Sequence, residues 1–309
     1  VCTTLADHLD VPPPLNFTDF SQPRIRKAIT AITLVTASDG NHGAAVAWMA
    51  AQLGCRSKVL LPRGTIAARL DAIRTFGGQA IVIDGNYDDA VRRAARQADD
   101  QGHFLIQDTA WEGYEAIPER IMQGYLTLLD EALAQMGDTL PTHLFVPCGV
   151  GALAASLQAY LVERFADQRP RLVVIEAAAA DCYYRSMRAG GQEIILVKGE
   201  LATRMAGLAC GEPTRPGWEI LRRYADAFAS ARDDLAEAGM RRLAFPHPLD
   251  PPIEAGECGA VSAGCLCHIM QSETAQDERK QLGLGPESRI LLISTEGATD
   301  PDAYRHTVR

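Results

Sequence analysis

The chain has 309 residues, of which 47% are hydrophobic, and it carries a formal net charge of −9. Its length suits one large domain or two lobes with a sizeable core, and its acidity argues against a broad surface for nucleic acid or for an anionic membrane. It has no apolar run of membrane-spanning length, and its N-terminus, VCTTLADHLD, lacks the basic and then apolar pattern of a secretion signal.

Short apolar segments alternate with helical patterns along most of the chain. We expect strands in AITLV (31–35), SKVLLP (57–62), QAIVID (79–84), HFLIQD (103–108), THLFVPCG (142–149), RLVVIEA (171–177) and SRILLISTEG (288–297). Asp88 and Asp89 suit the start of a helix after the third of these segments. Strands separated by helices predict right-handed crossovers and parallel sheets flanked by helices. The sequence therefore predicts an α/β fold.

Two regions fit this pattern poorly. The first thirty residues contain VPPPLNF, whose prolines exclude a helix, and only its LNF portion is compatible with a strand. Residues 191–257 are rich in glycine and proline. They predict loops, either around a site or as a long surface excursion.

A glycine pair follows the expected strand at 142–149. Ligands of open parallel sheets collect at the carboxyl ends of strands, and Gly149-Val-Gly-Ala152 would open a helix there. Its backbone N–H groups could approach an anion, which favours a phosphate cradle. The segment has neither the third glycine of a dinucleotide motif nor the Lys-Ser/Thr pair of a P-loop. A glycine turn needed only for close packing is the alternative.

Asp39 and Asp108 each follow an apolar strand-like segment. Two carboxylates facing one cleft could act as general acid and base. Aspartate is also favoured at helix N-caps, and position alone favours capping for both residues, as it does for Asp84. The loop TASDGNHG (36–43) adds Asn41 and His42, and an isolated histidine is more often satisfied by backbone groups than catalytic.

The cysteines give little evidence of a metal site. All eight are scattered, and most lie in apolar surroundings, which predicts reduced thiols in a cytosolic protein. Cys265-Leu-Cys-His268 falls within an expected helix and has no second ligand pair, so we predict no metal there.

Several motifs together carry a family resemblance. The Gly40-Asn-His-Gly43 loop, the glycine pair and the hydroxyls of Ser294 and Thr295 resemble those of the fold-type II pyridoxal-phosphate enzymes, which include serine and threonine dehydratases. Four further stretches resemble the diaminopropionate ammonia-lyase family, and the match runs from about Thr33 to the C-terminus. These stretches are QDTAWEGYEAIPERIMQGY (107–125), MAGLACGEP (205–213), GECGA (256–260) and STEGATDPDAYRHTV (294–308).

The resemblance implies a fold and an activity. The fold would be the two-lobed, tryptophan synthase β-like one, with a smaller lobe at residues 33–125. Residues 1–32 and 126–309 would form the larger lobe with the phosphate-binding loop. The activity would be pyridoxal-phosphate-dependent α,β-elimination of 2,3-diaminopropionate, giving pyruvate and ammonia. Such a protein would be a cytoplasmic homodimer with a small amino acid as substrate and no nucleic-acid or membrane partner.

The resemblance also implies roles for single residues. Asn41 would contact the phenolic oxygen of the cofactor, and Ser294 or Thr295 its pyridine nitrogen. Asp39 and Asp108 match the two active-site aspartates of the family. They would move protons and engage the extra ammonium of a diamino acid, for which a carboxylate is a suitable partner. The phosphate would be bound by the backbone of Gly149, Val150, Gly151 and Ala152.

Asp39 also helps to distinguish an ammonia-lyase from a dehydratase. Dehydratases of this fold usually have serine at its position, so the aspartate argues against a serine or threonine dehydratase.

The lysine that forms a Schiff base with the cofactor in this family has no clear match. It stands well upstream of the Gly-Asn-His-Gly loop, where this chain reads NFTDFSQPRIRKAITAITLV (16–35). Lys27 is the candidate, although only five residues separate it from the strand expected at Thr33. A solvent-exposed lysine is the alternative for Lys27. The other lysines are Lys58 at a strand start, Lys280 in a polar helix and Lys198 in a loop, of which Lys198 stays open.

Three explanations are open for this mismatch. Lys27 forms the Schiff base in a shortened lobe. Alternatively, the segment is lost, which leaves a catalytically impaired relative that binds pyridoxal phosphate or an amino acid. In the third explanation, the molecule carries residues beyond this sequence. If Lys27 is not the base, Asp39 is the candidate for proton abstraction.

Overall fold

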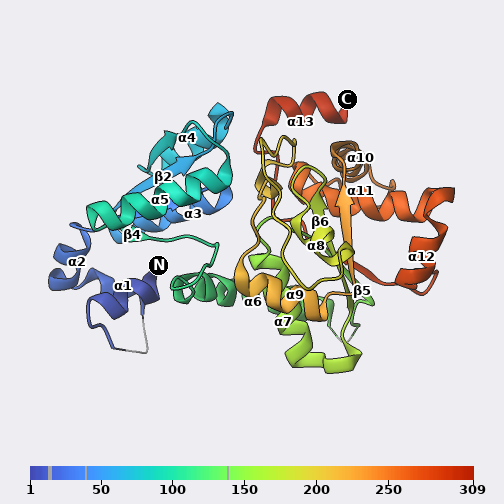
Figure 1. Ribbon diagram of the computed structural model, residues 1–309, viewed down its shortest axis with the longest axis horizontal. Helices are drawn as coiled ribbons and strands as arrows, with labels where there is room; N and C mark the ends of the chain where they lie inside the picture. Colours follow the sequence, from blue (N-terminus) through green and yellow to red (C-terminus); the bar gives the residue numbers. More distant parts are fainter. Residues whose placement is uncertain (13–15, 39, 138) are drawn as a thin grey trace. The chain divides into compact units, whose positions relative to one another are not determined.

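The computed structural model describes residues 1–12, 16–38, 40–137 and 139–309 (Figure 1). The chain forms two compact units, Val1–Asp108 and Thr109–Arg309. This division differs from the predicted lobes, which placed residues 1–32 in the larger lobe and residues 109–125 in the smaller one.

Contacts of the two segments that are divided differently explain the difference. In the first unit, Cys2 Sγ lies 3.8 Å from Met49 Sδ, and the ring of His8 packs edge-on against Phe104 with centroids 4.7 Å apart. In the second unit, the N–H of Ala110 donates to Thr214 Oγ1 at 2.8 Å. Each segment therefore belongs with the elements against which it packs.

The described residues of the first unit form a four-stranded parallel sheet with the strand order β3-β2-β1-β4. In its register, Val35 on β1 lies opposite Lys58 on β2 and Leu105 on β4. The strands are β1 (Thr33–Ala37), β2 (Arg56–Leu61), β3 (Gln79–Val82) and β4 (Phe104–Leu105). The helices are α1 (Cys2–His8), α2 (Pro23–Ile29), α3 (Asn41–Leu53), α4 (Ala67–Thr75) and α5 (Tyr87–Gln101), with a 3-10 turn η1 (Phe17–Ser21).

Helices cover both faces of this sheet, because its right-handed crossovers first move outward and then return. Ala47 of α3 and Ile73 of α4 pack with Val59 and Leu61 of β2 on one face. Helix α5 crosses the other face (Figure 1). It begins at a capping box in which Asn86 Oδ1 accepts from the N–H of Asp89 at 2.9 Å, so Asn86 rather than Asp84 is the cap.

The described part of the second unit repeats this topology in a four-stranded parallel sheet of order β7-β6-β5-β8. Its strands are β5 (His143–Pro147), β6 (Arg171–Ala177), β7 (Ala227–Ala231) and β8 (Ile290–Leu292). Its α-helices are α6 (Ala116–Met136), α7 (Ala152–Phe165), α8 (Cys182–Arg188), α9 (Arg215–Tyr224), α10 (Asp233–Ala244), α11 (Glu257–Gln271), α12 (Gln276–Leu282) and α13 (Pro301–Val308). Its 3-10 turns are η2 (Ala166–Gln168), η3 (Ala206–Leu208) and η4 (Glu273–Ala275).

The core of the second unit lies between this sheet and two adjacent helices, α10 and α11. Phe145 and Ile175 are fully buried on the sheet, and they belong to one apolar cluster with Ala236 of α10 and Val261 of α11. Because the crossover from β7 to β8 returns across the sheet, α10 and α11 cover one face, and the helices α7, α8 and α9 cover the other.

The two weak regions of the sequence contain more regular structure than predicted. Residues 191–257 hold α9, β7 and α10, so the prediction of loops throughout this region is wrong. Strand β7 reads AFASA, whose small residues give little strand signal. Near the N-terminus, Asn16 caps the turn η1 instead of entering a strand. Residues 13–15 lie outside the described part of the chain.

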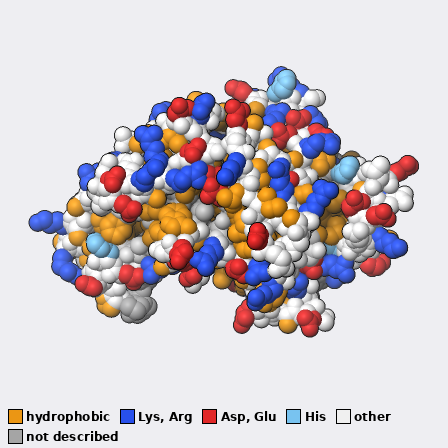
Figure 2. Space-filling model, viewed as in Figure 1, with side chains coloured by type: hydrophobic (Ala, Val, Ile, Leu, Met, Phe, Trp, Pro, Cys, Tyr) orange, Lys and Arg blue, Asp and Glu red, His pale blue; other side chains and the backbone are white. Residues whose placement is uncertain are grey.

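The surface carries mixed charge. On the face shown in Figure 2, acidic and basic side chains are interspersed among apolar ones. None of the helices in the described residues is both long and apolar enough to cross a membrane.

Each sheet has a topological switch point, where the order of the strands reverses, and the two switch points lie at corresponding strands. The strand order reverses between β1 and β4 in the first unit and between β5 and β8 in the second. Ligands of open α/β sheets bind beyond the carboxyl ends of the strands at such points. The loops after these four strands are therefore where a site is expected.

Candidate active site

The loop after β1 is held by one serine side chain. Ser38 Oγ accepts hydrogen bonds from the N–H groups of Gly40 at 2.9 Å and of Gly43 at 2.8 Å. A Cβ on Gly43 would lie 2.5 Å from Val59 Cγ1, so only glycine fits where α3 approaches β2. This arrangement leaves Asn41 exposed at the start of α3, with no hydrogen bond to any described residue. Its amide is available to a ligand.

Asp39 belongs to the same loop. This predicted catalytic residue lies outside the described residues, so its role stays a prediction.

His42 has a structural partner. Its Nε2 lies 2.8 Å from the carbonyl oxygen of Ile106, just beyond β4. A carbonyl only accepts, so Nε2 carries the proton and donates. His42 therefore fastens the start of α3 to the end of β4. The structure confirms that backbone groups satisfy this histidine.

Asp108 follows β4 and is oriented by two donors. Gln107 Nε2 donates to Asp108 Oδ1 at 2.8 Å, and the hydroxyl of Tyr87 donates to the same oxygen at 3.1 Å. The capping interpretation fails for Asp108, because the next helix, α6, begins only at Ala116. Asp108 is half-buried, and no described residue hydrogen-bonds its other oxygen, Oδ2.

The orientation of Gln107 follows from its own contacts. Its side chain is fully buried, and Oε1 accepts from the N–H of Ala37 at 2.9 Å and from Thr36 Oγ1 at 3.1 Å. A backbone N–H can only donate, so the amide oxygen must face β1 and the amide nitrogen must face Asp108. Gln107 Nε2 also lies 2.9 Å from the hydroxyl oxygen of Tyr87. The carboxylate thus sits in a network tied to the end of β1.

Neither Gln107 nor Tyr87 was identified from the sequence. The signal available for Gln107 was its place beside Asp108 at a strand end. Tyr87 opens a helix twenty-one residues earlier in the chain, and no local pattern connects the two positions.

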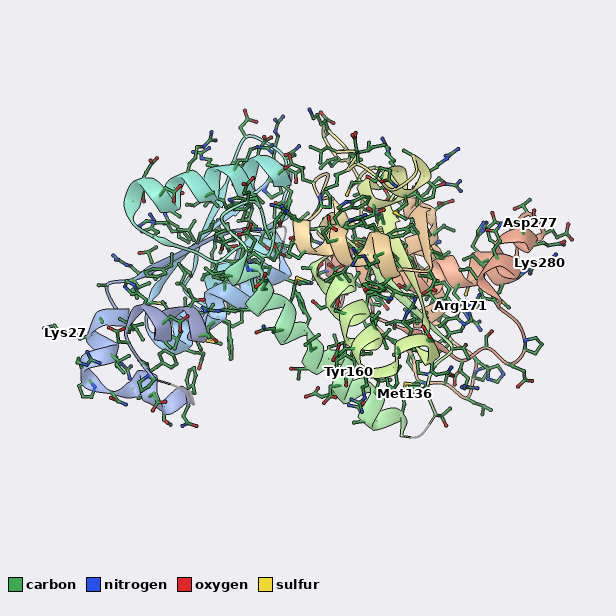
Figure 3. All side chains as sticks on the ribbon, turned by 60° about the horizontal axis from the view of Figure 1, so that its bottom comes forward. Lys27, Met136, Tyr160, Arg171, Asp277 and Lys280 are labelled. Atoms are coloured by element: carbon green, nitrogen blue, oxygen red, sulfur yellow. The ribbon has the colours of Figure 1, made fainter. Side chains whose placement is uncertain are left out.

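Lys27 lies away from these groups. It is exposed on α2, which precedes the amino end of β1, whereas Asn41 and Asp108 follow the carboxyl ends of β1 and β4. Strand β1 has five residues and spans about 16 Å. Figure 3 shows the Lys27 side chain directed outward. The structure therefore does not bring Lys27 to Asn41 or Asp108, the described site residues of its unit.

The other lysines are also placed by the structure. Lys58 Nζ donates to Gln101 Oε1 at 3.2 Å. Lys198 lies exposed in a loop, and Lys280 lies exposed on α12 (Figure 3). Neither position adds a reason to assign the Schiff base there.

In the second unit, the glycine pair forms a tight turn between β5 and α7. Gly151 is the N-cap of α7 with φ +95°, in the left-handed region that favours glycine. A Cβ there would lie 2.0 Å from Tyr183 Oη, and a Cβ on Gly149 would lie 2.8 Å from the carbonyl oxygen of Gly207. Both positions require glycine because the backbone is approached so closely.

This turn suits a phosphate group. In the described part of the chain, no acceptor is present for the N–H groups of Gly149, Val150, Gly151 and Ala152. They lie at the N-terminus of a 14-residue helix, where the helix dipole favours an anion. The backbone therefore provides several donors without an acceptor at a helix N-terminus, which would suit the phosphate of pyridoxal phosphate.

Ser294 and Thr295 follow β8 at the same edge of this sheet. Strand β8 pairs with β5, and the N–H of Ile293 donates to the carbonyl of Phe145 at 3.1 Å. Both hydroxyl residues are exposed. A Cβ on Gly259 of α11 would lie 2.8 Å from Ser294 Oγ, so this serine packs against the helix.

Three of the motifs behind the family resemblance meet around Glu296. Its buried Oε1 accepts from the N–H of Cys258 at 3.2 Å, and its carbonyl accepts from the N–H of Gly256 at 3.0 Å. A Cβ on Gly207 would lie 3.6 Å from Glu296 Oε2. The segments 205–213, 256–260 and 294–297 therefore pack together. Glu296 was not identified as a functional residue from the sequence.

A second buried carboxylate supports the region beneath the glycine turn. Glu176 is the penultimate residue of β6, and it accepts from the N–H of Tyr183 at 2.9 Å and of Tyr184 at 2.6 Å, at the start of α8. Burial raises the pKa of Glu176 to about 8, against the opposing effect of these two N–H groups. Burial also raises the pKa of Tyr183 and of the Cys148 thiol, so both stay protonated.

All eight cysteines are free. Cys265, Cys267 and His268 lie on α11, and the described residues contain no cluster of three or more groups that could hold a metal ion.

Comparisons with known proteins identify a family and similar proteins for this chain. Residues 22–296 match the family described as pyridoxal-phosphate dependent enzyme. The chain is 45% identical over 298 residues to diaminopropionate ammonia-lyase of Salmonella typhimurium, covering 95% of this chain and 74% of the relative.

Two crystal structures of Escherichia coli diaminopropionate ammonia lyase are also similar. One, in complex with an aminoacrylate–PLP azomethine reaction intermediate, is 46% identical with a TM-score of 0.84, covering 90% of this chain and 71% of that one. The other, in complex with D-serine, is 41% identical with a TM-score of 0.90, covering 99% and 76%.

Proposed function

The chain belongs to the pyridoxal-phosphate dependent enzymes, and we propose that it is a diaminopropionate ammonia-lyase. It would convert 2,3-diaminopropionate and water into pyruvate and two molecules of ammonia. The observation that carries the proposal is the Asp108 carboxylate, which is oriented through Oδ1 while Oδ2 stays open. A diamino acid presents an additional ammonium to such a group.

Pyridoxal phosphate, when bound, supplies an electron sink for the charge left by removal of the α-proton. The N–H groups of residues 149–152 would hold its phosphate. The amide of Asn41 would hydrogen-bond the ring oxygen, and a hydroxyl of Ser294 or Thr295 the ring nitrogen. Each of these groups is exposed or unpaired in its own unit, as a ligand-binding group must be.

Asp108 would bind the departing group in its ammonium form and keep it protonated, so that it can leave as neutral ammonia. Asp108 Oδ2 can accept a hydrogen bond from the β-ammonium of the substrate, which selects a diamino acid over serine. The β-amino group leaves as ammonia, and the aminoacrylate that is released hydrolyses to pyruvate and a second ammonia. Asp39 is assigned to α-proton abstraction if no lysine performs it.

A serine or threonine dehydratase is the enzyme alternative. A dehydratase expels a neutral hydroxyl group. The Asp108 carboxylate would give no selective binding to such a group, as it would to an ammonium. Comparing 2,3-diaminopropionate with serine as substrates separates the two enzymes.

A binding protein without turnover is the second candidate, and the position of Lys27 favours it. The test adds pyridoxal phosphate to the purified chain, reduces with borohydride and maps any modified lysine by mass spectrometry. A modified lysine together with turnover supports the lyase. Bound cofactor with neither a modified lysine nor turnover supports the binding protein, and absence of cofactor binding contradicts both.

We also propose that the protein is a cytoplasmic homodimer without a nucleic-acid or membrane partner. The free cysteines are compatible with a reducing compartment. The dimer rests on the family resemblance alone, and light scattering of the purified chain tests it.

A further inference from the structure

Tyr183 lies directly beneath the glycine turn. Its side chain is fully buried, and its hydroxyl donates to the carbonyl oxygen of Val150 at 2.9 Å. The N–H of Thr214 donates to the same oxygen at 2.8 Å. Because burial raises the pKa of Tyr183, the hydroxyl keeps its proton and acts as a donor.

These two hydrogen bonds determine which way one peptide faces. The carbonyl of Val150 and the N–H of Gly151 belong to one planar trans peptide, in which they point in opposite directions. Donors on the carbonyl oxygen therefore turn the Gly151 N–H away from Tyr183. Glycines flank Val150 on both sides, so the turn itself has little preference for one peptide orientation. The orientation must come from outside the turn.

The position of the hydroxyl is itself closely defined. Glu176 accepts the N–H of Tyr183 and so fixes the start of α8, and the tyrosine ring stacks against Phe228 with centroids 6.3 Å apart. A Cβ on Gly151 would lie 2.0 Å from Tyr183 Oη, and a Cβ on Gly217 would lie 2.6 Å from it. The hydroxyl fits only because both of these positions are glycine.

We propose that Tyr183 is a positioning residue of the phosphate site, whose hydroxyl holds the Val150–Gly151 peptide so that the Gly151 N–H faces the phosphate. This inference rests on the proposed assignment of residues 149–152 to the phosphate. Tyr183 contacts the turn on the side of the Val150 carbonyl, opposite to the Gly151 N–H, and it would act on the phosphate only through this peptide. It adds a side-chain determinant to a site otherwise made of backbone.

The test compares the variants Tyr183→Phe and Tyr184→Phe with the unmodified chain. Tyr184 is the adjacent residue, and its hydroxyl makes no hydrogen bond to a described residue, so it is the matched control. Dissociation constants are measured for pyridoxal phosphate and for pyridoxal, which lacks the phosphate. In Tyr183→Phe we expect binding of pyridoxal phosphate to weaken about tenfold and binding of pyridoxal to stay unchanged. Tyr184→Phe should leave both unchanged.

A second variant reaches the same hydroxyl from the other side. Gly217→Ala places a methyl group 2.6 Å from Tyr183 Oη and 2.7 Å from Thr214 Cγ2. It therefore disturbs both residues that donate to the Val150 carbonyl and should also weaken pyridoxal phosphate binding selectively. In the Tyr183→Phe background, where the tyrosine hydroxyl is absent, Gly217→Ala should have a smaller effect. Gly217 lies in the first turn of α9, where alanine favours the helix, so this variant tests the proposal even if Tyr183→Phe fails to fold.

The outcomes separate this inference from the proposed function. Unchanged pyridoxal phosphate affinity in Tyr183→Phe overturns the inference, as does an equal loss for pyridoxal, which would indicate general structural damage. If the unmodified chain turns over 2,3-diaminopropionate, the proposed function stands in either case. If the unmodified chain binds no pyridoxal phosphate, the proposed function itself fails.

Discussion

The two sheets share one topology but present different chemistry at their switch points. Beyond β1 and β4, the first unit offers side chains, with the amide of Asn41 and the carboxylate of Asp108. Beyond β5, the second unit offers backbone N–H groups at residues 149–152. In both units the strand order reverses at the place where these groups stand.

Under the proposed function, this difference would match what each ligand group requires. A phosphate is a permanent anion of fixed shape, which backbone donors at a helix N-terminus bind without moving a proton. A substrate ammonium needs a negatively charged partner that keeps it protonated until it leaves, and only a side chain supplies such a charge. The first site therefore depends on which side chains are present, and the second depends on where side chains are missing.

Adding a single methyl group to the backbone site should have the largest effect on cofactor binding. Gly151→Ala puts a Cβ 2.0 Å from Tyr183 Oη at a residue with φ +95°, so the turn must distort. We expect pyridoxal phosphate binding to weaken more than about a hundredfold, as measured by fluorescence titration. Gly124→Ala, where a Cβ meets nothing within 4 Å, is the control. An affinity within twofold of the unmodified chain would contradict the phosphate assignment.

Changing the carboxylate of the side-chain site should affect turnover without affecting cofactor binding. Asp108→Asn keeps Oδ1 as an acceptor for Gln107 and Tyr87 but removes the negative charge that would hold the substrate ammonium. We expect kcat for 2,3-diaminopropionate to fall about 10²- to 10⁴-fold. The exposed carboxylate of Asp84, which pairs with Arg63 at 2.7 Å, gives the control Asp84→Asn. An unchanged kcat would remove Asp108 from the reaction.

A smaller effect is expected from the group that orients this carboxylate. Tyr87→Phe deletes the 3.1 Å hydrogen bond to Asp108 Oδ1 but leaves the one from Gln107. We expect kcat to fall about tenfold, equivalent to about 1.4 kcal/mol. In the Asp108→Asn background the same substitution should change kcat much less, because Tyr87 acts through Asp108. Equal effects in both backgrounds would show that Tyr87 acts elsewhere.

The last prediction concerns the stability of the second unit rather than binding or turnover. Burial raises the pKa of Glu176 from 4.5 to about 8, so between these pH values the folded chain binds one more proton than the unfolded chain. This contribution is fully present below about pH 4.5 and is lost as the pH rises to about 8, by at most about 1.4 kcal/mol per pH unit. Urea unfolding of Glu176→Gln should lack this decline. Parallel pH profiles for the two proteins would contradict the shifted pKa.

The sequence predicted elements best where the local signal was strong. RLVVIEA is rich in β-branched residues and forms β6 over the predicted range, 171–177. AFASA at 227–231 consists mostly of small residues, and the strand there depends on pairing with β6. Tertiary pairing of this kind leaves no local pattern.

The same limit applies to the site. The glycine turn was predictable because glycine residues, which have no side chain, can be read directly from the sequence. The setting of Asp108 was not, because it depends on Tyr87 and on a buried amide that reaches back to β1. Lys27 lies close to the site loop in sequence. Strand β1 separates them, however, and it runs from the amino end of the sheet, near Lys27, to the carboxyl end, where the loop lies.

The most direct test of the proposed function is the release of pyruvate by the purified chain loaded with pyridoxal phosphate. Turnover of 2,3-diaminopropionate is measured beside that of serine under the same conditions. We predict that pyruvate forms from 2,3-diaminopropionate with a kcat/KM at least about tenfold above that for serine, a difference of about 1.4 kcal/mol in transition-state binding. Turnover of serine alone, or of neither substrate with the cofactor bound, would contradict the lyase assignment.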